Sequence, residues 1–351
     1  MSGVWSCNEW DPLEEVIVGN PYNAEYFTHD KSTQLVEFPK RSIESLPRGV
    51  FPRKVVEETE EDLCAFIETL QKQGITVRRP SAWEHQAKFS TIHWEAHGYN
   101  NYCPRDIMAV IGDHIIESPN VVRSRLFETF SYRDILIDYL KSGAKWYSAP
   151  KPMLKDSMFE VDRAGKPVPL DDEPVFDAAN ILRLGYDLLY LVSASGNELG
   201  GQWLQTILGN KFRVHLLKDL YYGSHIDTTF VALRPGLVLC NPERINDETM
   251  PEILKQWDTI YSPPMVTAKN EYGAEYSKNS IGGPWINMNM LSISPNLAVV
   301  DKDQLPLINL LEKKKIDVIP LKLRHAAFLA GGFHCVTLDV RRRGEMQSYF
   351  E

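Results

Sequence analysis

The residues best suited to covalent chemistry are a cysteine and a histidine. Cys335 ends the segment Gly331-Gly-Phe-His-Cys at the head of a β-rich run, and the two glycines allow the backbone to be approached closely. His225 lies two positions before Asp227. On a strand, positions i and i+2 face the same side, so this imidazole and this carboxylate would point into one space. A thiol near an imidazole suits nucleophilic catalysis.

Two more carboxylates and one guanidinium are candidates for substrate contacts. Asp106 and Asp177 stand shortly before β-rich runs, at matching points of a repeated pattern described below. Arg244 follows another such run and could hold a substrate carboxylate, although a surface arginine is the plainer interpretation. Several carboxylates around one pocket suit a cation, and a planar guanidinium offers them paired hydrogen bonds.

Each candidate also has a structural explanation. A single cysteine is commonly a small buried apolar side chain, which is how we interpret Cys64, Cys103 and Cys240. A histidine near a carboxylate is often a hydrogen-bonded structural residue, and an aspartate before a strand often caps a turn. A metal site is disfavoured because no third ligand has metal-site spacing.

A recurring pattern indicates which elements position these residues. Two β-rich runs joined by a tight turn are typical of a hairpin, and such pairs follow Asp106, Asp177, Asp227 and Asn289. A fifth unit would combine the run at 13–19 with the run at 335–341. Amphipathic windows that favour helices lie between the hairpins at 55–73, 132–142, 198–208, 250–257 and 304–314.

Hairpin, helix and strand, repeated about five times, predict modules around a pseudo-symmetry axis. The expected fold is α/β, with residues 1–351 forming a single closed domain. A repeat also predicts that equivalent loops converge at the centre. The carboxylates, the histidine and Cys335 should therefore face one cavity.

Composition narrows the function further. Of 351 residues, 43% are hydrophobic and 24% charged, which excludes disordered and fibrous classes. Lys plus Arg total 38 against 47 for Asp plus Glu, and this acidic balance disfavours nucleic-acid binding. The basic run at 341–343 is interpreted as a solvated or ion-paired edge. The five cysteines are scattered, and no apolar stretch approaches the roughly 20 residues of a membrane span, so we expect a soluble cytoplasmic protein.

Four ordered motifs resemble the L-arginine amidinotransferase family. They are Cys-Pro-Arg-Asp (103–106), Phe-Asp-Ala-Ala-Asn (176–180), His-Ile-Asp-Thr-Thr (225–229) and Gly-Gly-Phe-His-Cys (331–335). The resemblance covers essentially the whole chain and is strongest to the inosamine-phosphate branch, while the family also contains glycine amidinotransferase and enzymes of alkaloid-toxin pathways. It implies the pentein fold, a five-bladed propeller of ββαβ modules.

The resemblance also assigns roles to residues. It implies Cys335 as nucleophile, His225 as acid and base, and Asp177 as the partner that orients the histidine. Asp106 and Asp227 would hold the guanidinium, and Arg244 the carboxylate of arginine. Gly282 and Gly283 stand where glycine amidinotransferase has serines, and Ser224 is smaller than expected in a glycine-specific enzyme; all three predict a roomier pocket.

The implied reaction moves an amidino group from L-arginine to Cys335 and then to the primary amine of an acceptor, with release of ornithine and without cofactor or metal. The expected acceptor is a natural-product amine of aminoglycoside or saxitoxin-like alkaloid biosynthesis. A phosphorylated acceptor would need cations, for which Arg105, Arg123, Arg125 and Lys151 are candidates. The alternatives are glycine as acceptor, hydrolysis as in arginine deiminase, and a binding module without catalysis. A homodimer would be ordinary for the family.

Overall fold

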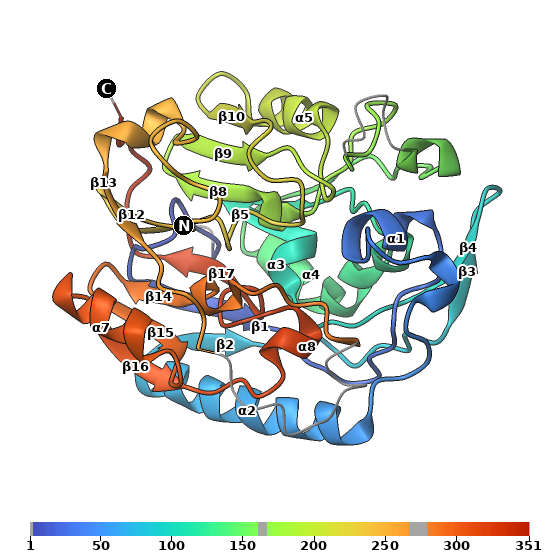
Figure 1. The fold of residues 1–351 in the computed structure, drawn as a ribbon, viewed down its shortest axis with the longest axis horizontal. Coiled ribbons are helices and arrows are strands. Elements are labelled where there is room, and N and C mark those ends of the chain that lie inside the picture. The colour runs from blue at the N-terminus through green and yellow to red at the C-terminus, as the bar shows by residue number, and fades with distance from the viewer. Residues whose placement is uncertain (1–2, 161–166, 267–278, 351) are drawn as a thin grey trace.

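The computed structural model describes residues 3–160, 167–266 and 279–350. Its described strands include five three-stranded sheets, which succeed one another around a common centre (Figure 1). The first sheet contains β5 (Met108–Ile111), β6 (His114–Glu117) and β7 (Lys145–Ser148), and the second contains β8 (Ile181–Leu184), β9 (Asp187–Leu191) and β10 (Arg213–Leu217). The third contains β11 (Phe230–Arg234), β12 (Leu237–Cys240) and β13 (Asp258–Tyr261), and the fourth contains β14 (Leu291–Ser294), β15 (Leu297–Asp301) and β16 (Asp317–Leu321). The fifth contains β17 (Thr337–Arg342), β1 (Leu13–Val18) and β2 (Thr76–Arg78).

All five sheets share one topology. The middle strand pairs antiparallel with its hairpin partner and parallel with the third strand, as β9 does with β8 and β10. In the fifth sheet the hairpin partners come from opposite ends of the chain, because β17 runs antiparallel to β1. The predicted repeat, its α/β class and its non-local fifth unit are therefore confirmed.

The hairpin turns are fixed by local chemistry. Three of them contain a glycine with positive φ, namely Gly112 (59°), Gly185 (70°) and Gly236 (78°). A residue with a Cβ atom is strained in this left-handed region. The two-residue turns set the register, so that Leu184 pairs with Asp187 and Ile111 with His114.

A helical segment precedes the third strand of each sheet. The described α-helices are α1 (Lys31–Glu37), α2 (Arg53–Lys72), α3 (Pro104–Ile107), α4 (Arg133–Lys141), α5 (Glu198–Leu208), α7 (Leu305–Lys313) and α8 (Ala326–Leu329). Helix α2 buries Leu63, Phe66 and Leu70 on the apolar face that the sequence predicts, and Ile67 is partly buried. Cys64 on the same helix is exposed, so its interpretation as a buried cysteine is wrong. Helix α5 is capped by Asn197, whose side chain accepts a hydrogen bond from the amide of Gly200.

One predicted helix has a different form. The window at 250–257 folds as a 3₁₀-helix, η6 (Glu252–Gln256), rather than an α-helix. Pro251 starts it, and β13 begins at Asp258, so there is no room for two α-helical turns. Other short 3₁₀-helices used below are η5 (Ala178–Asn180) and η7 (Ile286–Met288). In the described part of the chain, no helix combines the length and apolar character that crossing a bilayer requires.

The topology places one short segment per sheet at the centre of the ring. Asp106 is in α3 just before β5, Asp177 precedes η5 and β8, and Asp227 comes shortly before β11. Asn289 and Cys335 lie just before β14 and β17. The five positions thus occupy equivalent places, as the repeat predicts.

Candidate active site

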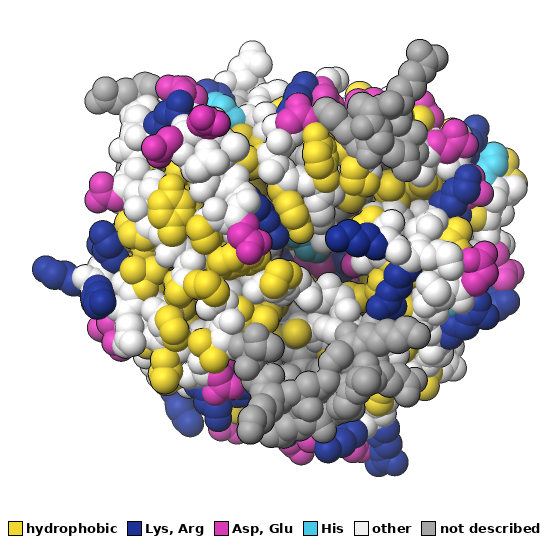
Figure 2. Space-filling view, viewed as in Figure 1, with side chains coloured by type: hydrophobic (Ala, Val, Ile, Leu, Met, Phe, Trp, Pro, Cys, Tyr) yellow, Lys and Arg dark blue, Asp and Glu magenta, His cyan; other side chains and the backbone are white. Residues whose placement is uncertain are grey.

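A cavity of about 210 Å³ lies where these segments meet. Figure 2 shows it as a hollow near the middle of one face, with acidic and histidine side chains visible inside. The lining includes eight of the nine predicted site residues: Asp106, Ser224, His225, Asp227, Arg244, Gly282, Gly283 and Cys335. The ninth, Asp177, is fully buried behind His225.

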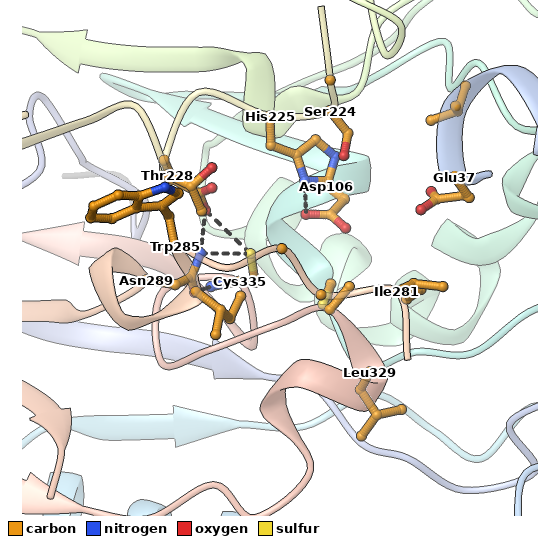
Figure 3. A pocket seen from close by; sticks show the side chains of 18 of the residues that line it. Glu37, Asp106, Ser224, His225, Thr228, Ile281, Trp285, Asn289, Leu329 and Cys335 are labelled. Atoms are coloured by element: carbon orange, nitrogen blue, oxygen red, sulfur yellow. Dashed lines mark hydrogen bonds and ion pairs between the residues drawn. The ribbon is translucent and has the colours of Figure 1, made fainter. Parts of the chain in front are cut away.

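Cys335 is held in the cavity by Asn289. The Cys335 amide donates to Asn289 Oδ1 at 2.9 Å, and Asn289 Nδ2 donates to Cys335 Sγ at 3.0 Å (Figure 3). The thiol itself donates to Asp227 Oδ2 at 3.2 Å. Gly332 is needed for this approach, because a Cβ atom there would lie 2.6 Å from the carbonyl oxygen of Asn289.

His225 is fixed by its backbone and by Asp177. Its φ of 65° is in the left-handed region, an uncommon conformation for a non-glycine residue that concentrates at functional sites. Its Nε2 lies 3.1 Å from Asp177 Oδ2, and Asn120 donates to the other carboxylate oxygen at 2.8 Å. Because an ionised carboxylate can only accept, Nε2 carries a proton and Nδ1 is left to face Asp106 and the cavity.

The charges around His225 and Cys335 favour a protonated imidazole and a protonated thiol. Burial alone would lower the pKa of His225, but Asp106 and Asp177 outweigh it and raise that pKa well above its usual value. The pKa of the Cys335 thiol is also raised well above its usual value, by hydrogen bonding with Cys103, by burial and by the charge of Asp227. His225 acts in the opposite direction. A cation bound in the cavity would therefore be needed to favour the thiolate.

The two carboxylates predicted to hold a cation differ in their surroundings. Asp106 Oδ2 is paired with Arg125 at 2.8 Å, whereas its Oδ1 is buried without a hydrogen-bond partner among the described residues. Asp227 Oδ2 accepts from Asn289 at 2.7 Å and contacts His334 Nδ1 at 3.0 Å. Burial alone would raise the pKa of Asp227, but His334, the charge of His225 and the hydrogen bond from Cys335 outweigh it and lower that pKa to about 2. Both groups are thus placed to accept from a guanidinium.

Arg244 is a cation with no carboxylate partner within the described ranges. Its Nη1 donates to Thr228 and Thr229 oxygens at 2.7–3.1 Å, and its guanidinium carbon lies 3.5 Å from the ring centroid of Tyr221. Burial lowers its pKa. A half-buried guanidinium beside neutral partners is suited to bind an incoming carboxylate.

The two glycines do different work. A Cβ atom at Gly282 would lie 2.6 Å from the carbonyl oxygen of Ala327, so this glycine allows its segment to pack on α8. A Cβ atom at Gly283 would meet nothing within 4 Å. Only Gly283 leaves open space, with Ser224 also on the cavity wall.

Several residues at the site were not predicted. Glu37 and Asn289 line the cavity, as does Arg125, which the sequence offered only as a cation for a phosphorylated acceptor. Cys103 is buried, as expected for a core cysteine, but its thiol also belongs to the cavity beside Cys335. Asn289 was detectable, because it stands at the matching point of the fourth repeat. Glu37 and Arg125 come from connecting segments that carry no repeated pattern.

The candidate phosphate cations mostly point elsewhere. Arg105 binds Asp339, Arg123 binds the carbonyl oxygen of Leu154 and Asp156, and Lys151 donates to the carbonyl oxygen of Leu126. Of the four, Arg125 alone is among the described lining residues, and it is bound to Asp106 and Glu128.

One group of side chains has metal-like spacing. The ligand atoms of Cys103, Asp106 and Cys335 lie within 4.8 Å of one another. A metal ion there would occupy the thiol of Cys335 and would meet the positive charge of Arg125, which is 2.8 Å from Asp106. The absence of a metal from the reaction stays a prediction.

No family model matches this chain, but individual proteins do. It is 48% identical to inosamine-phosphate amidinotransferase 1 of Streptomyces glaucescens over 351 residues, covering 99% of both chains. The chain belongs to the amidinotransferase family. It is also 36% identical to the mitochondrial glycine amidinotransferase of Xenopus tropicalis, over 99% of this chain and 85% of that protein.

Solved amidinotransferase structures are also similar to this chain and support the same family assignment. Inosamine-phosphate amidinotransferase StrB1 of Streptomyces griseus superposes with a TM-score of 0.94 at 47% identity over the full length of both chains. SxtG, an amidinotransferase of Microseira wollei in the saxitoxin biosynthetic pathway, gives 0.87 at 35% identity over 99% of each. DDAH of Pseudomonas aeruginosa gives 0.58 at 13% identity over 93% of this chain and 99% of that one, which shows the shared pentein fold alone. The predicted family, fold and enzyme class are confirmed.

Proposed function

We propose that this enzyme moves the amidino group of L-arginine to Cys335 and from there to the primary amine of a small acceptor, releasing ornithine. One observation carries the proposal. The cavity that holds the Cys335 thiol and His225 also holds a buried carboxylate oxygen of Asp106 without a hydrogen bond and a cation, Arg244, with no acidic partner in the described chain. Arginine supplies the complementary groups, a guanidinium at one end and a carboxylate at the other.

In the first half-reaction, Asp106 and Asp227 bind the guanidinium while Arg244 binds the carboxylate. The added positive charge lowers the pKa of the Cys335 thiol, whose proton passes to solvent. The thiolate forms a bond to the central guanidinium carbon, and protonated His225 donates its Nδ1 proton to the departing nitrogen. The C–N bond breaks, leaving ornithine as a free amine, neutral His225 and a cationic amidino-cysteine.

In the second half-reaction, the acceptor amine attacks the same carbon as a free base. His225 takes a proton from the attacking nitrogen, and the C–S bond breaks to return a thiolate and a protonated imidazole. Asp177 holds the imidazole with Nε2 protonated in both steps, so that Nδ1 faces the reacting nitrogen. The site is then restored once the thiolate regains its proton.

The acceptor is proposed to be a natural-product amine. Support comes from the similarity to the inosamine-phosphate enzymes and to SxtG, and from the open space at Gly283 and Ser224. Arg105, Arg123 and Lys151 give no support to a phosphate subsite, because their hydrogen bonds go to protein groups.

The test is intact-protein mass spectrometry after mixing enzyme with L-arginine and no acceptor. For the native enzyme we expect one added amidino group per chain and one equivalent of released ornithine. With Cys335→Ala we expect neither product. Steady citrulline formation without an acceptor would overturn the proposal in favour of a hydrolase. Competition between glycine and larger amines for the adduct separates the natural-product acceptor from the glycine alternative.

Three further features stay proposals. We propose that residues 1–351 act as one catalytic domain, since the site draws on all five sheets. We propose a reducing compartment, the cytoplasm, since the reaction needs a free Cys335 and the five cysteines are unpaired. A homodimer is also proposed, and sedimentation velocity would test it.

A further inference from the structure

Glu37 is an acidic residue on the cavity wall for which the reaction above has no use. It is the last residue of α1, a helix held by the Asp30 cap and by a hydrogen bond from the Arg123 amide to Ser32 Oγ. Val36 and Pro39, on either side of it, also line the cavity. In Figure 3 the Glu37 carboxylate points into the cavity toward Asp106.

Glu37 differs from the other acidic groups of the site because its carboxylate has no hydrogen-bond or ion-pair partner among the described residues. Asp106 is bound to Arg125, Asp177 to His225 and Asp227 to Asn289, whereas no hydrogen bond or ion pair joins Glu37 to any described residue. Burial raises the pKa of Glu37 to about 7, with His225 and Arg125 acting in the opposite direction. A partly buried carboxylate without donors is unfavourable, and a ligand that supplies them recovers that free energy.

The position of Glu37 separates it from the donor substrate. Arg244, which would bind the carboxylate of arginine, is bonded to Thr228. Figure 3 shows Thr228 and Trp285 on one side of Cys335, and Glu37 on the other side, beyond Asp106. Arginine held by Arg244 and the two aspartates would therefore extend away from Glu37.

The wall near Glu37 also suits a carbon skeleton. Figure 3 places Ile281 and Leu329 on this side of Cys335, and Phe27 and Tyr99 complete an apolar lining. A ligand here would bury C–H surface against these side chains while offering a polar donor to a single acceptor, as is usual in small-molecule sites.

We propose that Glu37 binds the acceptor, through a second hydrogen-bond donor, an ammonium or hydroxyl group, on the molecule whose amine attacks the amidino-cysteine. This inference rests on the proposed function. It selects diamines and amino alcohols, which include aminocyclitols, over simple amines. It also disfavours glycine, which has no second hydrogen-bond donor to offer Glu37 once its amine attacks the amidino-cysteine.

The experiment uses the isolated amidino-enzyme and follows its loss with four amines: 1,4-diaminobutane, 4-amino-1-butanol, butylamine and glycine. For the native enzyme, the first two should react fastest. Glu37→Gln should slow the diamine roughly tenfold to a hundredfold, because a charged hydrogen bond is lost. The amino alcohol should be slowed less, since an amide oxygen still accepts, and Glu37→Ala should slow both.

Exchange of labelled ornithine into arginine is the internal control. Ornithine binds again at Arg244, so Glu37→Gln should slow exchange much less than it slows the diamine reaction, whereas the matched variant Glu44→Gln, at an exposed residue beyond α1, should leave both rates unchanged. Equal slowing of exchange and diamine reaction would overturn the inference by placing Glu37 in the donor site. Unchanged rates with every amine would overturn it as well. Failure to form the amidino-enzyme would instead count against the proposed function.

Discussion

Two groups of buried charges lie next to each other in this enzyme and are built differently. One is the cavity with Cys335. The other is a cluster behind it that we call the paired cluster, made of Glu9, Arg105, Arg183, Asp339 and Arg342. His334 connects the two groups, because its Nδ1 lies 3.0 Å from Asp227 in the cavity and its Nε2 lies 3.5 Å from Glu9 in the paired cluster.

The paired cluster is complete within itself. Asp339 is contacted by Arg105, by Arg183 at 2.5 Å and by Arg342 at 2.7 Å, and these cations outweigh burial to hold its pKa well below the usual range. Arg183 is bound to both oxygens of Glu9. Each charge has a partner, so a ligand would gain nothing by entering.

In the cavity, by contrast, some charged groups lack a partner within the protein. Asp106 keeps one buried oxygen unbonded, and in the described part of the chain Arg244 and Glu37 have no partner of opposite charge. The difference shows that buried charge alone does not mark a functional site. What marks it is charge whose partner the protein does not supply.

The largest effect should come from Asp177→Asn. An amide can donate to the histidine and favour the wrong tautomer, so kcat should fall about 10³- to 10⁴-fold. The variant also tests stability, because contacts with His225 and Arg125 outweigh burial and lower the pKa of Asp177. A carboxylate whose pKa is lowered in the folded state stabilises the protein at pH values above its unfolded pKa, and this stabilisation is lost as the pH falls through the folded pKa. The unfolding free energies of the native enzyme and the variant should therefore converge as pH falls. A native-like kcat would remove Asp177 from the mechanism.

In the paired cluster, Asp339→Asn should act on folding. The change takes a carboxylate from three buried guanidinium groups; Arg105 and Arg183 keep Glu9, but Arg342 loses the one carboxylate to which it is ion-paired among the described residues, and the loss should cost about 3–5 kcal/mol. Urea denaturation at pH 7 measures the loss. If the variant were as stable as the native enzyme, the cluster would not be the closed structural unit described here.

Arg244→Gln should show the opposite pattern. Loss of a charge-assisted pair with substrate should raise KM for arginine roughly tenfold to a hundredfold, while urea stability changes by less than about 1 kcal/mol. Agmatine, which is arginine without its carboxylate, is the matched control and should be insensitive to the change. Equal effects on both donors would place Arg244 outside the carboxylate site.

The two neighbouring glycines give a smaller, paired test. Gly282→Ala forces a Cβ atom against the Ala327 carbonyl and should cost about 1–3 kcal/mol of stability. Gly283→Ala meets open space and should leave stability unchanged while slowing bulky acceptors. Thermal unfolding and acceptor competition measure the two effects. Similar melting temperatures for both variants would contradict the assignment.

The smallest effect should come from Cys103→Ala. Hydrogen bonding with Cys103 is the first cause of the raised pKa of Cys335, so its removal should lower that pKa. Alkylation of Cys335 by iodoacetamide should then be roughly twofold to tenfold faster at pH 8, because the thiolate is the reacting form. Cys240→Ala, a buried cysteine of another sheet, should leave the rate unchanged. A slower reaction in Cys103→Ala would reverse the assigned sign.

The repeated parts of this molecule were predictable from sequence, and the irregular parts were not. Two β-rich runs around a turn predicted the hairpins, and the recurring positions of Asp106, Asp177 and Asp227 predicted that they would meet. Local periodicity could not distinguish α from 3₁₀ at 250–257, where Pro251 decides the outcome.

For a physical reason, the sequence did not place Glu37 in the site and offered Arg125 only as a cation for a phosphorylated acceptor, not as the partner of Asp106. Glu37 and Arg125 reach the cavity only because their segments cross the rim, and that path depends on tertiary packing. Arg342 belongs to a basic run expected at a solvated or ion-paired edge; it is ion-paired, but it is fully buried against Asp339. No local sequence pattern reveals that Asp339, three positions before Arg342, is ion-paired with three arginines.

The pairing of β17 with β1 has a consequence for biosynthesis. At about 5–20 residues per second, β1 waits tens of seconds on the ribosome before its antiparallel partner is made. Cys335 is delivered just ahead of that same partner strand. The growing chain therefore receives Cys335, the nucleophile of the proposed reaction, only when the strand that closes the last blade is about to be made, although Cys103, the other thiol of the cavity, is made much earlier.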